Sequence, residues 1–268
     1  MSAGASAVLL MQDHGRVRCI TFNRPDRRNA WSDELSAAYA VALAEADRDP
    51  GVRAIVVAAE GPSFCVGGDM ADLKSFAANR TFSRPDIVRS VPWQTTAVRK
   101  PVIAAVQGGC AGVGLAHALT CDVRFAAADA RFATSYARRG LPAESGTAWL
   151  LSRVVGVGAA SDLLLSGRVI GAQEALQLGL VNRVVPAGEV VTEALGYAQD
   201  IAQSCSPAAM QTIKQQLWEA LAEESFEVSA TMADQLAERF LAEEDDVAEG
   251  VQSFIEKRPP EFGALPSR

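Results

Sequence analysis

The sequence predicts an α/β protein in which a mixed body, residues 1–188, is followed by a helical region, residues 189–268. Short apolar runs bounded by glycine and proline recur through the body, which is typical of buried strands. Stretches with helical spacing of apolar residues separate these runs. From about residue 189 the periodicity is almost wholly helical, and its apolar stripes contain Leu217, Leu221, Leu236, Phe240, Val247, Val251 and Phe254.

The N-terminal elements follow from turn and cap residues. Apolar runs at residues 8–12 and 17–22 surround an Asp-His-Gly sequence, so we expect a hairpin. Ser32 can cap a helix that extends to about residue 48, where a Pro-Gly pair ends it. Residues 53–59, with the sequence RAIVVAA, form a candidate buried strand.

The middle of the chain alternates in the same way. The expected elements are helices over residues 87–98, 115–120, 146–156 and 159–166 and strands over residues 101–106, 123–127 and 181–185. Strand and helix patterns thus alternate through the body, as in an α/β protein.

Composition argues against several classes of function. The formal net charge of −7 argues against a general nucleic-acid binder, which needs a basic surface. No apolar run approaches the roughly 18 residues that span a bilayer, and the start lacks the order of a signal peptide. Five cysteines without a CxxC pair, and only two histidines, indicate a cytoplasmic protein with reduced thiols and no metal site.

Two segments share one design, in which a buried strand leads through a loop of small residues into a helix. The first is RAIVVAAEGPSFCVGGDM and the second is PVIAAVQGGCAGVGLAHAL. Glycine lets the backbone approach a ligand closely, and a helix N-terminus leaves N–H donors free. Two such donors aimed at one point form an oxyanion hole, which enolate chemistry on a thioester requires. Taken alone, either loop is better explained as a tight packing turn.

The second loop also invites comparison with a dinucleotide-binding turn. However, Gly112-Val113-Gly114 is followed by His117 where the G-x-G-x-x-G/A pattern needs a small residue. No acidic residue closes a strand about 20 residues further on, and there is no G-x-x-x-x-G-K-[ST] loop. A nicotinamide-dependent oxidoreductase remains an alternative class that binding of NAD would reveal.

Four stretches are informative together: residues 20–30 (ITFNRPDRRNA), 64–69 (FCVGGD), 103–122 and 254–259 (FIEKRP). In this order and spacing they resemble the crotonase (enoyl-CoA hydratase/isomerase) superfamily, and the resemblance covers nearly the whole chain. It implies a spiral of ββα units that forms two sheets surrounded by helices. It also implies that the C-terminal helical region drives assembly into a homotrimer or a dimer of trimers.

By this resemblance, the backbone N–H groups of Gly68 and Val113 are the oxyanion donors for an acyl-CoA thioester. No resident cofactor is implied, because coenzyme A arrives with the substrate. The resemblance also places Arg27, Arg28 and Lys257 along the path of CoA. For each of these three, an ordinary solvated cation is an equally good explanation. Asp69 also fits as a helix cap. Lys257 is expected to reach a phosphate, either in its own subunit or in a neighbouring one. The positions placed along the CoA and acyl path are Arg27, Arg28, Val66, Gly67, Asp69, Met70, Tyr136 and Lys257.

Proton transfer needs a positioned acid or base beside the oxyanion hole. Typical hydratases of this superfamily use two glutamates to hold and activate a water molecule. Counted without gaps from the second loop, those positions are Ala116 and Tyr136 here, and neither side chain is a carboxylate. The sequence therefore departs from the two-glutamate mechanism, and Tyr136 is expected to pack in the pocket or donate a hydrogen bond there.

One acidic residue, Glu144, lies in the expected region, just before an apolar helix. Other branches of the superfamily place an acidic group at this loop position. We expect Glu144 to be the general acid/base, with a nucleophilic role as the lesser alternative. Burial among Val113, Leu141 and Trp149 should raise its pKa. The competing explanation is a carboxylate that stabilises the helix dipole, with Ser145 as the cap.

Three other features have plainer explanations. His117 lies next to Ala116 and is expected to be a hydrogen-bonded core residue, because adjacent helical positions point in different directions. Asp122 opens a strand and is expected to anchor a turn. Residues 81–92 are expected to form a lid over the acyl chain, or else a surface loop.

The sequence therefore predicts an acyl-CoA-processing enzyme. It is an enoyl-CoA hydratase or isomerase that acts through a stabilised thioester enolate with one catalytic carboxylate. Because both usual glutamates are absent, a non-catalytic CoA-thioester-binding homologue is the main alternative.

Overall fold

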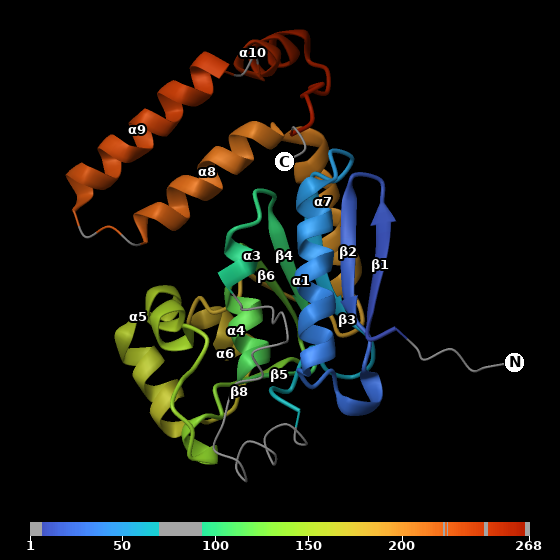
Figure 1. The fold of residues 1–268 in the computed structure, drawn as a ribbon, viewed down its shortest axis with the longest axis vertical. Helices are drawn as coiled ribbons and strands as arrows, with labels where there is room; N and C mark the ends of the chain where they lie inside the picture. The colour runs from blue at the N-terminus through green and yellow to red at the C-terminus, as the bar shows by residue number, and fades with distance from the viewer. Residues whose placement is uncertain (1–6, 70–92, 222, 224, 244–245, 266–268) are drawn as a thin grey trace, which may run out of the picture.

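A six-stranded sheet forms the centre of the computed structural model, which describes residues 7–69, 93–221, 223, 225–243 and 246–265 (Figure 1). The first two strands are antiparallel, and every later neighbour in the sheet is parallel. In sheet order the strands are β1 (Leu9–His14), β2 (Val17–Phe22), β3 (Ala54–Ala59), β4 (Val102–Val106), β6 (Val123–Ala127) and β9 (Arg183–Val185).

The N-terminal predictions are confirmed. The predicted hairpin is formed by β1 and β2, in which Leu9 pairs with Phe22 and His14 with Val17. Helix α1 (Asp33–Arg48) begins after Ser32, whose side chain accepts a hydrogen bond from the Leu35 N–H at 3.3 Å. The cap satisfies one of the N–H groups that a helix start leaves without an intrahelical partner.

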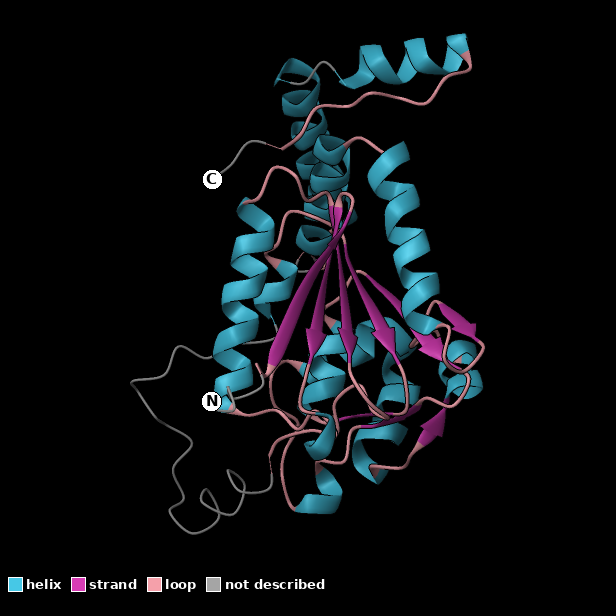
Figure 2. Cartoon of the chain, turned by 90° about the vertical axis from the view of Figure 1, so that its right-hand side faces the viewer, coloured by secondary structure: helices cyan, strands magenta, loops and turns pink. Residues whose placement is uncertain are grey.

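Helices lie on both sides of this sheet (Figure 2), and a separate cluster of buried apolar residues packs on each face. Alternate residues of β3 point to opposite faces, so Val57 packs with α1 and Val56 packs with α7 (Val190–Ser204). Small residues of α7, such as Ala194 and Ala198, bring that helix close to the strands. Helix α7 is therefore part of the packed body, and the division predicted at residue 188 stays a prediction.

The resemblance implied a second sheet, and the structure has one, but the residue pattern did not predict its three strands. This sheet consists of β5 (Gly109–Ala111), β7 (Arg131–Ala133) and β8 (Ile170–Gly171). Strand β5 lies inside the second glycine-bearing segment, in the part that the sequence predicted to be a loop. The other helices and helical turns before α7 are η1 (Pro25–Arg27), α3 (Trp93–Thr96), α4 (Val113–Leu119), η2 (Ala137–Arg139), α5 (Thr147–Ser166) and α6 (Ala172–Gln177).

Helix α5 merges two helices that the sequence predicts separately. Gly156 has φ 79° and ψ 156°, so the helix breaks at the predicted junction. By length and composition alone, α5 is a candidate membrane span among the described helices. Arg153 and Asp162 lie within this helix, so it contains no uninterrupted apolar run of the roughly 18 residues that span a bilayer. Of the helix predicted over residues 87–98, residues 87–92 lie outside the described part of the chain.

The C-terminal helices extend beyond one end of the sheet (Figure 1). They are α8 (Pro207–Ala220), α9 (Phe226–Glu243) and α10 (Asp246–Glu256). Several of their large apolar side chains are exposed in the single chain, and these are Leu217, Val228, Leu241, Val247, Val251, Phe254 and Ile255.

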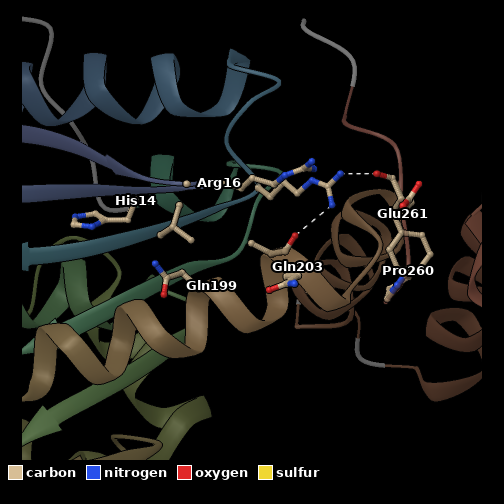
Figure 3. Close-up of a pocket in the computed structure, with 11 residues that line it drawn as sticks. His14, Arg16, Gln199, Gln203, Pro260 and Glu261 are labelled. Carbon is tan, nitrogen blue, oxygen red and sulfur yellow. Dashed lines mark hydrogen bonds between the residues drawn. The ribbon is translucent and has the colours of Figure 1, made fainter. Parts of the chain in front are cut away.

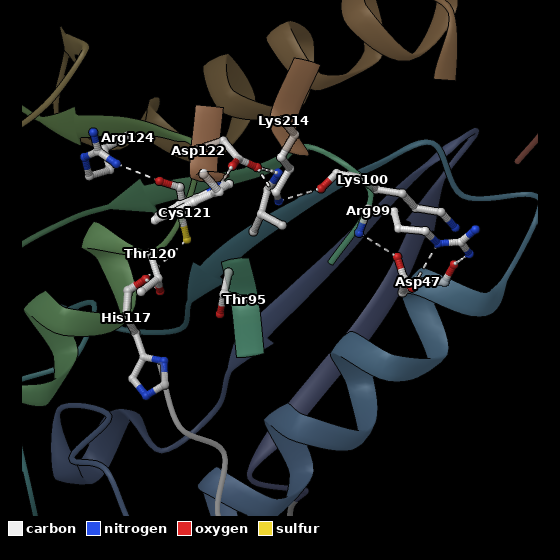
Figure 4. Close-up of polar contacts among 12 residues, drawn as sticks. Asp47, Thr95, Arg99, Lys100, His117, Thr120, Cys121, Asp122, Arg124 and Lys214 are labelled. Carbon is white, nitrogen blue, oxygen red and sulfur yellow. Dashed lines mark hydrogen bonds and ion pairs between the residues drawn. The ribbon is translucent and has the colours of Figure 1, made fainter. Parts of the chain in front are cut away.

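Asp122 anchors α8 to the body (Figure 4). Its carboxylate accepts hydrogen bonds from the Val102 N–H at 2.7 Å and the Lys214 ammonium at 2.7 Å, and also from the Trp218 indole at 3.3 Å. The Lys214 side chain is only 8% exposed. Asp122 thus joins β4 to α8 across a distance of many residues in the chain.

Replacing Asp122 by asparagine is expected to destabilise the protein by about 2 kcal/mol, because the buried Lys214 ammonium keeps its charge and loses its charged hydrogen-bond partner. Urea denaturation measures this loss, and Asp200→Asn on the exposed surface of α7 is the matched control. Equal stability of the two variants would contradict the anchoring role.

Candidate active site

A cavity of about 330 Å³ lies where the two glycine-bearing loops meet the segment before α5. The structure brings together nearly every residue that the sequence predicts for the site. Met70 and the proposed lid, residues 81–92, lie outside the described residues. The lining residues are Arg27, Arg28, Ala30, Val66, Gly67, Gly68, Asp69, Gly112, Val113, Thr134, Ser135, Tyr136, Arg139, Leu141 and Glu144.

The two loops are hydrogen-bonded to one another. The Cys65 N–H donates to the Gly109 carbonyl at 3.1 Å, and the Cys65 carbonyl accepts from the Ala111 N–H at 2.9 Å. Gly114 fits under this pairing only because it lacks a side chain, since a Cβ there would lie 2.4 Å from the Cys65 oxygen. The contact fixes the position of the first loop relative to the start of α4.

The Gly68 N–H is left free by the pairing around it. The Trp31 N–H donates to the Gly67 carbonyl at 2.8 Å, and the Trp31 carbonyl accepts from the Asp69 N–H at 2.9 Å. In a parallel bridge of this kind, the central residue's own N–H points away from the partner strand. The Gly68 N–H donates no hydrogen bond to another described residue.

The Val113 N–H is free for a different reason. Val113 is the first residue of α4, where an N–H has no intrahelical acceptor. The neighbouring Gly112 N–H is already used, because it donates to the Ala133 carbonyl at 3.1 Å. Gly112 has φ 53° and ψ −124°, a backbone conformation that glycine adopts most readily. Gly68 and Val113, whose N–H groups have no acceptor in the described part of the chain, therefore line one cavity.

Among the described residues that line the cavity, the carboxylates are those of Glu144 and Asp69. Burial raises the pKa of Glu144 above the ordinary glutamate value, as predicted. The residue lines the cavity and is exposed to solvent, so the cavity walls reduce the hydration of its carboxylate without enclosing it. Trp149 is not among the lining residues, because its ring packs under the Arg153 guanidinium at 3.8 Å.

Ser145 does not cap α5, contrary to the alternative explanation of this turn. Gly146 is the residue before the helix and no side chain caps it. Ser145 and Gly146 both have left-handed backbones, with φ 56° and 71°. This tight turn carries Glu144 away from the helix axis and toward the cavity.

Tyr136 supports this turn. The Thr147 hydroxyl donates to the Glu144 carbonyl at 2.8 Å, so it accepts the hydrogen bond from the Tyr136 hydroxyl at 3.0 Å. Burial raises the pKa of Tyr136 to about 12. Tyr136 therefore lines the cavity as a neutral group whose proton is already committed to Thr147.

Comparison with known proteins identifies the family. The model of the family described as enoyl-CoA hydratase/isomerase matches residues 12–264. This chain belongs to the enoyl-CoA hydratase/isomerase family. It is 34% identical to the 2,3-dehydroadipyl-CoA hydratase of Escherichia coli, over 95% of this chain and 98% of that protein. It is also 34% identical to the mevalonyl-coenzyme A hydratase of Beauveria bassiana, over 91% and 90%.

Solved structures confirm the crotonase fold. The crystal structure of an enoyl-CoA hydratase from Polaromonas superposes with a TM-score of 0.88 at 32% identity, and covers 95% of this chain and 99% of that one. The resemblance drawn from the sequence motifs is therefore confirmed.

Within the described residues, no group of three or more histidine, cysteine or acidic residues could hold a metal ion.

Enoyl-CoA hydratases usually have two catalytic glutamates. At the first of these positions this chain has Ala116, which is fully buried in α4. The adjacent His117 is also buried, and it stacks on Trp31 with ring centroids 3.9 Å apart. The prediction that His117 is hydrogen-bonded is wrong within the described residues, since neither ring nitrogen has a partner there. Burial lowers its pKa to about 3, so the ring is neutral and packs as an aromatic group.

The basic residues predicted for CoA divide into two groups. Arg27 and Arg28 line the cavity, and Arg139, which sequence reasoning did not select, lines it as well. Lys257 does not line this cavity in the single chain, because it follows α10 in the projecting helical region. The Asp69 carboxylate pairs with Arg24 at 2.9 Å, and the helix that it was expected to cap lies outside the described residues.

Proposed function

We propose that this protein acts on an enoyl-CoA thioester through an enolate, with Glu144 as its single proton-transfer group. The observation that carries the proposal is that two unpaired N–H groups, of Gly68 and Val113, and the Glu144 carboxylate belong to one cavity. Hydrogen bonds from the two donors to the thioester oxygen would stabilise the charge that develops on that oxygen.

Double-bond isomerisation fits this arrangement better than hydration. Glu144 would remove a proton from the acyl carbon next to the double bond, and the electron pair would move to the thioester oxygen. The same carboxyl group would return the proton to a different carbon, so the double bond shifts and nothing is added. Hydration by the usual route needs a second carboxylate to hold water, and Ala116 and Tyr136 cannot supply one.

A panel of enoyl-CoA thioesters with 2,3- and 3,4-double bonds tests this proposal. Products are identified by mass spectrometry, because hydration adds the mass of water and isomerisation does not. Tight CoA binding without turnover of any thioester would instead favour a non-catalytic CoA-binding homologue. Stabilisation by NAD but not by CoA would overturn both.

The pH dependence of kcat/KM should reveal a carboxylate that must be ionised. Because burial raises the pKa of Glu144, activity should fall as the pH decreases through a midpoint above the ordinary glutamate value. The measurement is kcat/KM as a function of pH, with the substrate that the enoyl-CoA panel identifies. A flat profile through this acid range would contradict the role of Glu144 as the base.

The exposed apolar side chains of α8 to α10 support self-association, and the proposed assembly is a homotrimer or a dimer of trimers. In that assembly Lys257 would approach the CoA of a neighbouring subunit. Light scattering after gel filtration measures the mass in solution, and a strict monomer would remove this part of the proposal. We also propose a cytoplasmic location for the protein, as its composition leads us to expect.

A further inference from the structure

A second cavity of about 670 Å³ lies at the end of the sheet away from the candidate active site (Figure 3). It is bounded by the β1–β2 turn, by the last turns of α7 and by the C-terminal tail at residues 260–262. The starts of β2 and β3 contribute to it, whereas the active-site loops follow the ends of the strands. The lining includes Arg16, Arg53, Gln199 and Gln203.

Arg53 lines this cavity as a buried cation that has no carboxylate partner in the described part of the chain. It is 5% exposed, and its guanidinium donates to three carbonyl oxygens, of Ala202, Phe262 and Gly263. A guanidinium has five N–H donors, so two remain, and the buried Nε has no partner among the described residues. Neutral carbonyl groups compensate only part of the cost of burying a charge.

Arg16 places a second cation beside Arg53. The two residues are adjacent across neighbouring strands, since the Arg53 N–H donates to the Arg16 carbonyl at 2.7 Å. Burial, and then the charge of Arg16, lower the pKa of Arg53, and Asp246 offsets only part of this effect. Among the described residues neither arginine forms a salt bridge, although Glu261 also lines the cavity.

We propose that this cavity binds a small phosphorylated molecule whose phosphate is held by Arg16 and Arg53. A phosphate dianion matches two guanidinium cations in charge, whereas a single carboxylate matches one. The volume is within the range of small-molecule sites, about 300–1,000 Å³, and exceeds what a lone phosphate needs. Gln199, Gln203 and His14 supply polar contacts for the rest of the ligand.

Isothermal titration calorimetry with inorganic phosphate, pyrophosphate and citrate at constant ionic strength tests the site. Wild-type protein should bind pyrophosphate at one saturable site, and Arg16→Gln should weaken this binding about tenfold, as expected for one lost charged hydrogen-bonding group. Arg16 is exposed and has a side chain outside the packed core, so the variant should fold normally. Arg48→Gln on α1 removes the same charge from outside the cavity and should bind pyrophosphate like the wild type.

Repeating the pyrophosphate titration in the presence of saturating free CoA distinguishes this cavity from the CoA path. Unchanged affinity supports the proposal, and loss of binding would place the anion in the other cavity and overturn it. The proposal also fails if no phosphate probe binds at millimolar concentration, if only citrate binds, or if Arg16→Gln binds as tightly as Arg48→Gln. None of these outcomes depends on which acyl-CoA the protein acts on.

Discussion

Replacing Glu144 by glutamine is expected to lower kcat/KM for an active enoyl-CoA by about 100- to 10,000-fold, the usual contribution of a positioned general acid or base. The amide keeps the shape and hydrogen-bonding reach of the carboxyl group but cannot accept a proton. Binding of free CoA should change little, because it has no acyl carbon for Glu144 to act on and the cations Arg27, Arg28 and Arg139 of the cavity remain. The measurement is steady-state kinetics with the substrate that the enoyl-CoA panel identifies.

The thermal stability of the Glu144→Gln variant separates a catalytic loss from a structural one. The pKa of Glu144 is raised in the folded state, so its contribution to stability is lost as the pH rises through that pKa. Above that pH the charged carboxylate costs stability and glutamine does not, so the Tm should stay the same or rise slightly. Glu193→Gln on the exposed surface of α7 is the control, and full activity of Glu144→Gln would exclude the proposed role.

Strands buried on both faces were predictable from sequence because their apolar runs are continuous. Residues 54–59 and 102–106 are buried along their whole length, and the predicted ranges differ by only one residue at the N-terminal end. Strand β8 has only two residues, and β5 contains a glycine. Such short elements exist because other parts of the chain pair with them, which no local pattern encodes.

The candidate site shows the same division between local and distant causes. The two glycine-bearing loops were predictable from the local pattern of buried strand and small residues, whereas the choice of Gly68 and Val113 as donors came from the resemblance to the superfamily. Arg139 was missed because an exposed arginine in a 3₁₀ turn has no local feature that distinguishes it from a solvated cation. Ser145 does not cap the helix because both Ser145 and Gly146 have a left-handed backbone. A serine followed by a glycine does not predict this conformation at both residues.

The closeness of the two oxyanion loops depends on Gly114. A methyl group there would meet the Cys65 carbonyl oxygen at 2.4 Å and the Cys65 Cβ at 2.7 Å. Both atoms belong to or adjoin the backbone of the first loop, so neither can rotate away. Gly114→Ala must therefore push α4, with its Val113 N–H, away from the loop that carries Gly68.

We expect Gly114→Ala to lower kcat by about 100- to 1,000-fold, the effect of losing one oxyanion-hole donor, and to destabilise the protein by about 1–3 kcal/mol through overpacking. Kinetics below the unfolding transition and urea denaturation measure the two effects separately. Gly196→Ala is the matched control, because a Cβ at this position of α7 meets no atom within 4 Å. Alanine should stabilise that helix by about 0.5–1 kcal/mol.

The contrast between kcat and CoA affinity decides what the loop contact does. If the contact aligns the two donors, Gly114→Ala should lose kcat at a temperature where it is fully folded, while free CoA, which has no thioester oxygen, binds nearly as before. If the contact only contributes to packing, the folded variant should turn over substrate at the wild-type rate. That second result would leave Gly68 and Val113 without a shared catalytic task, even though both residues line the same cavity.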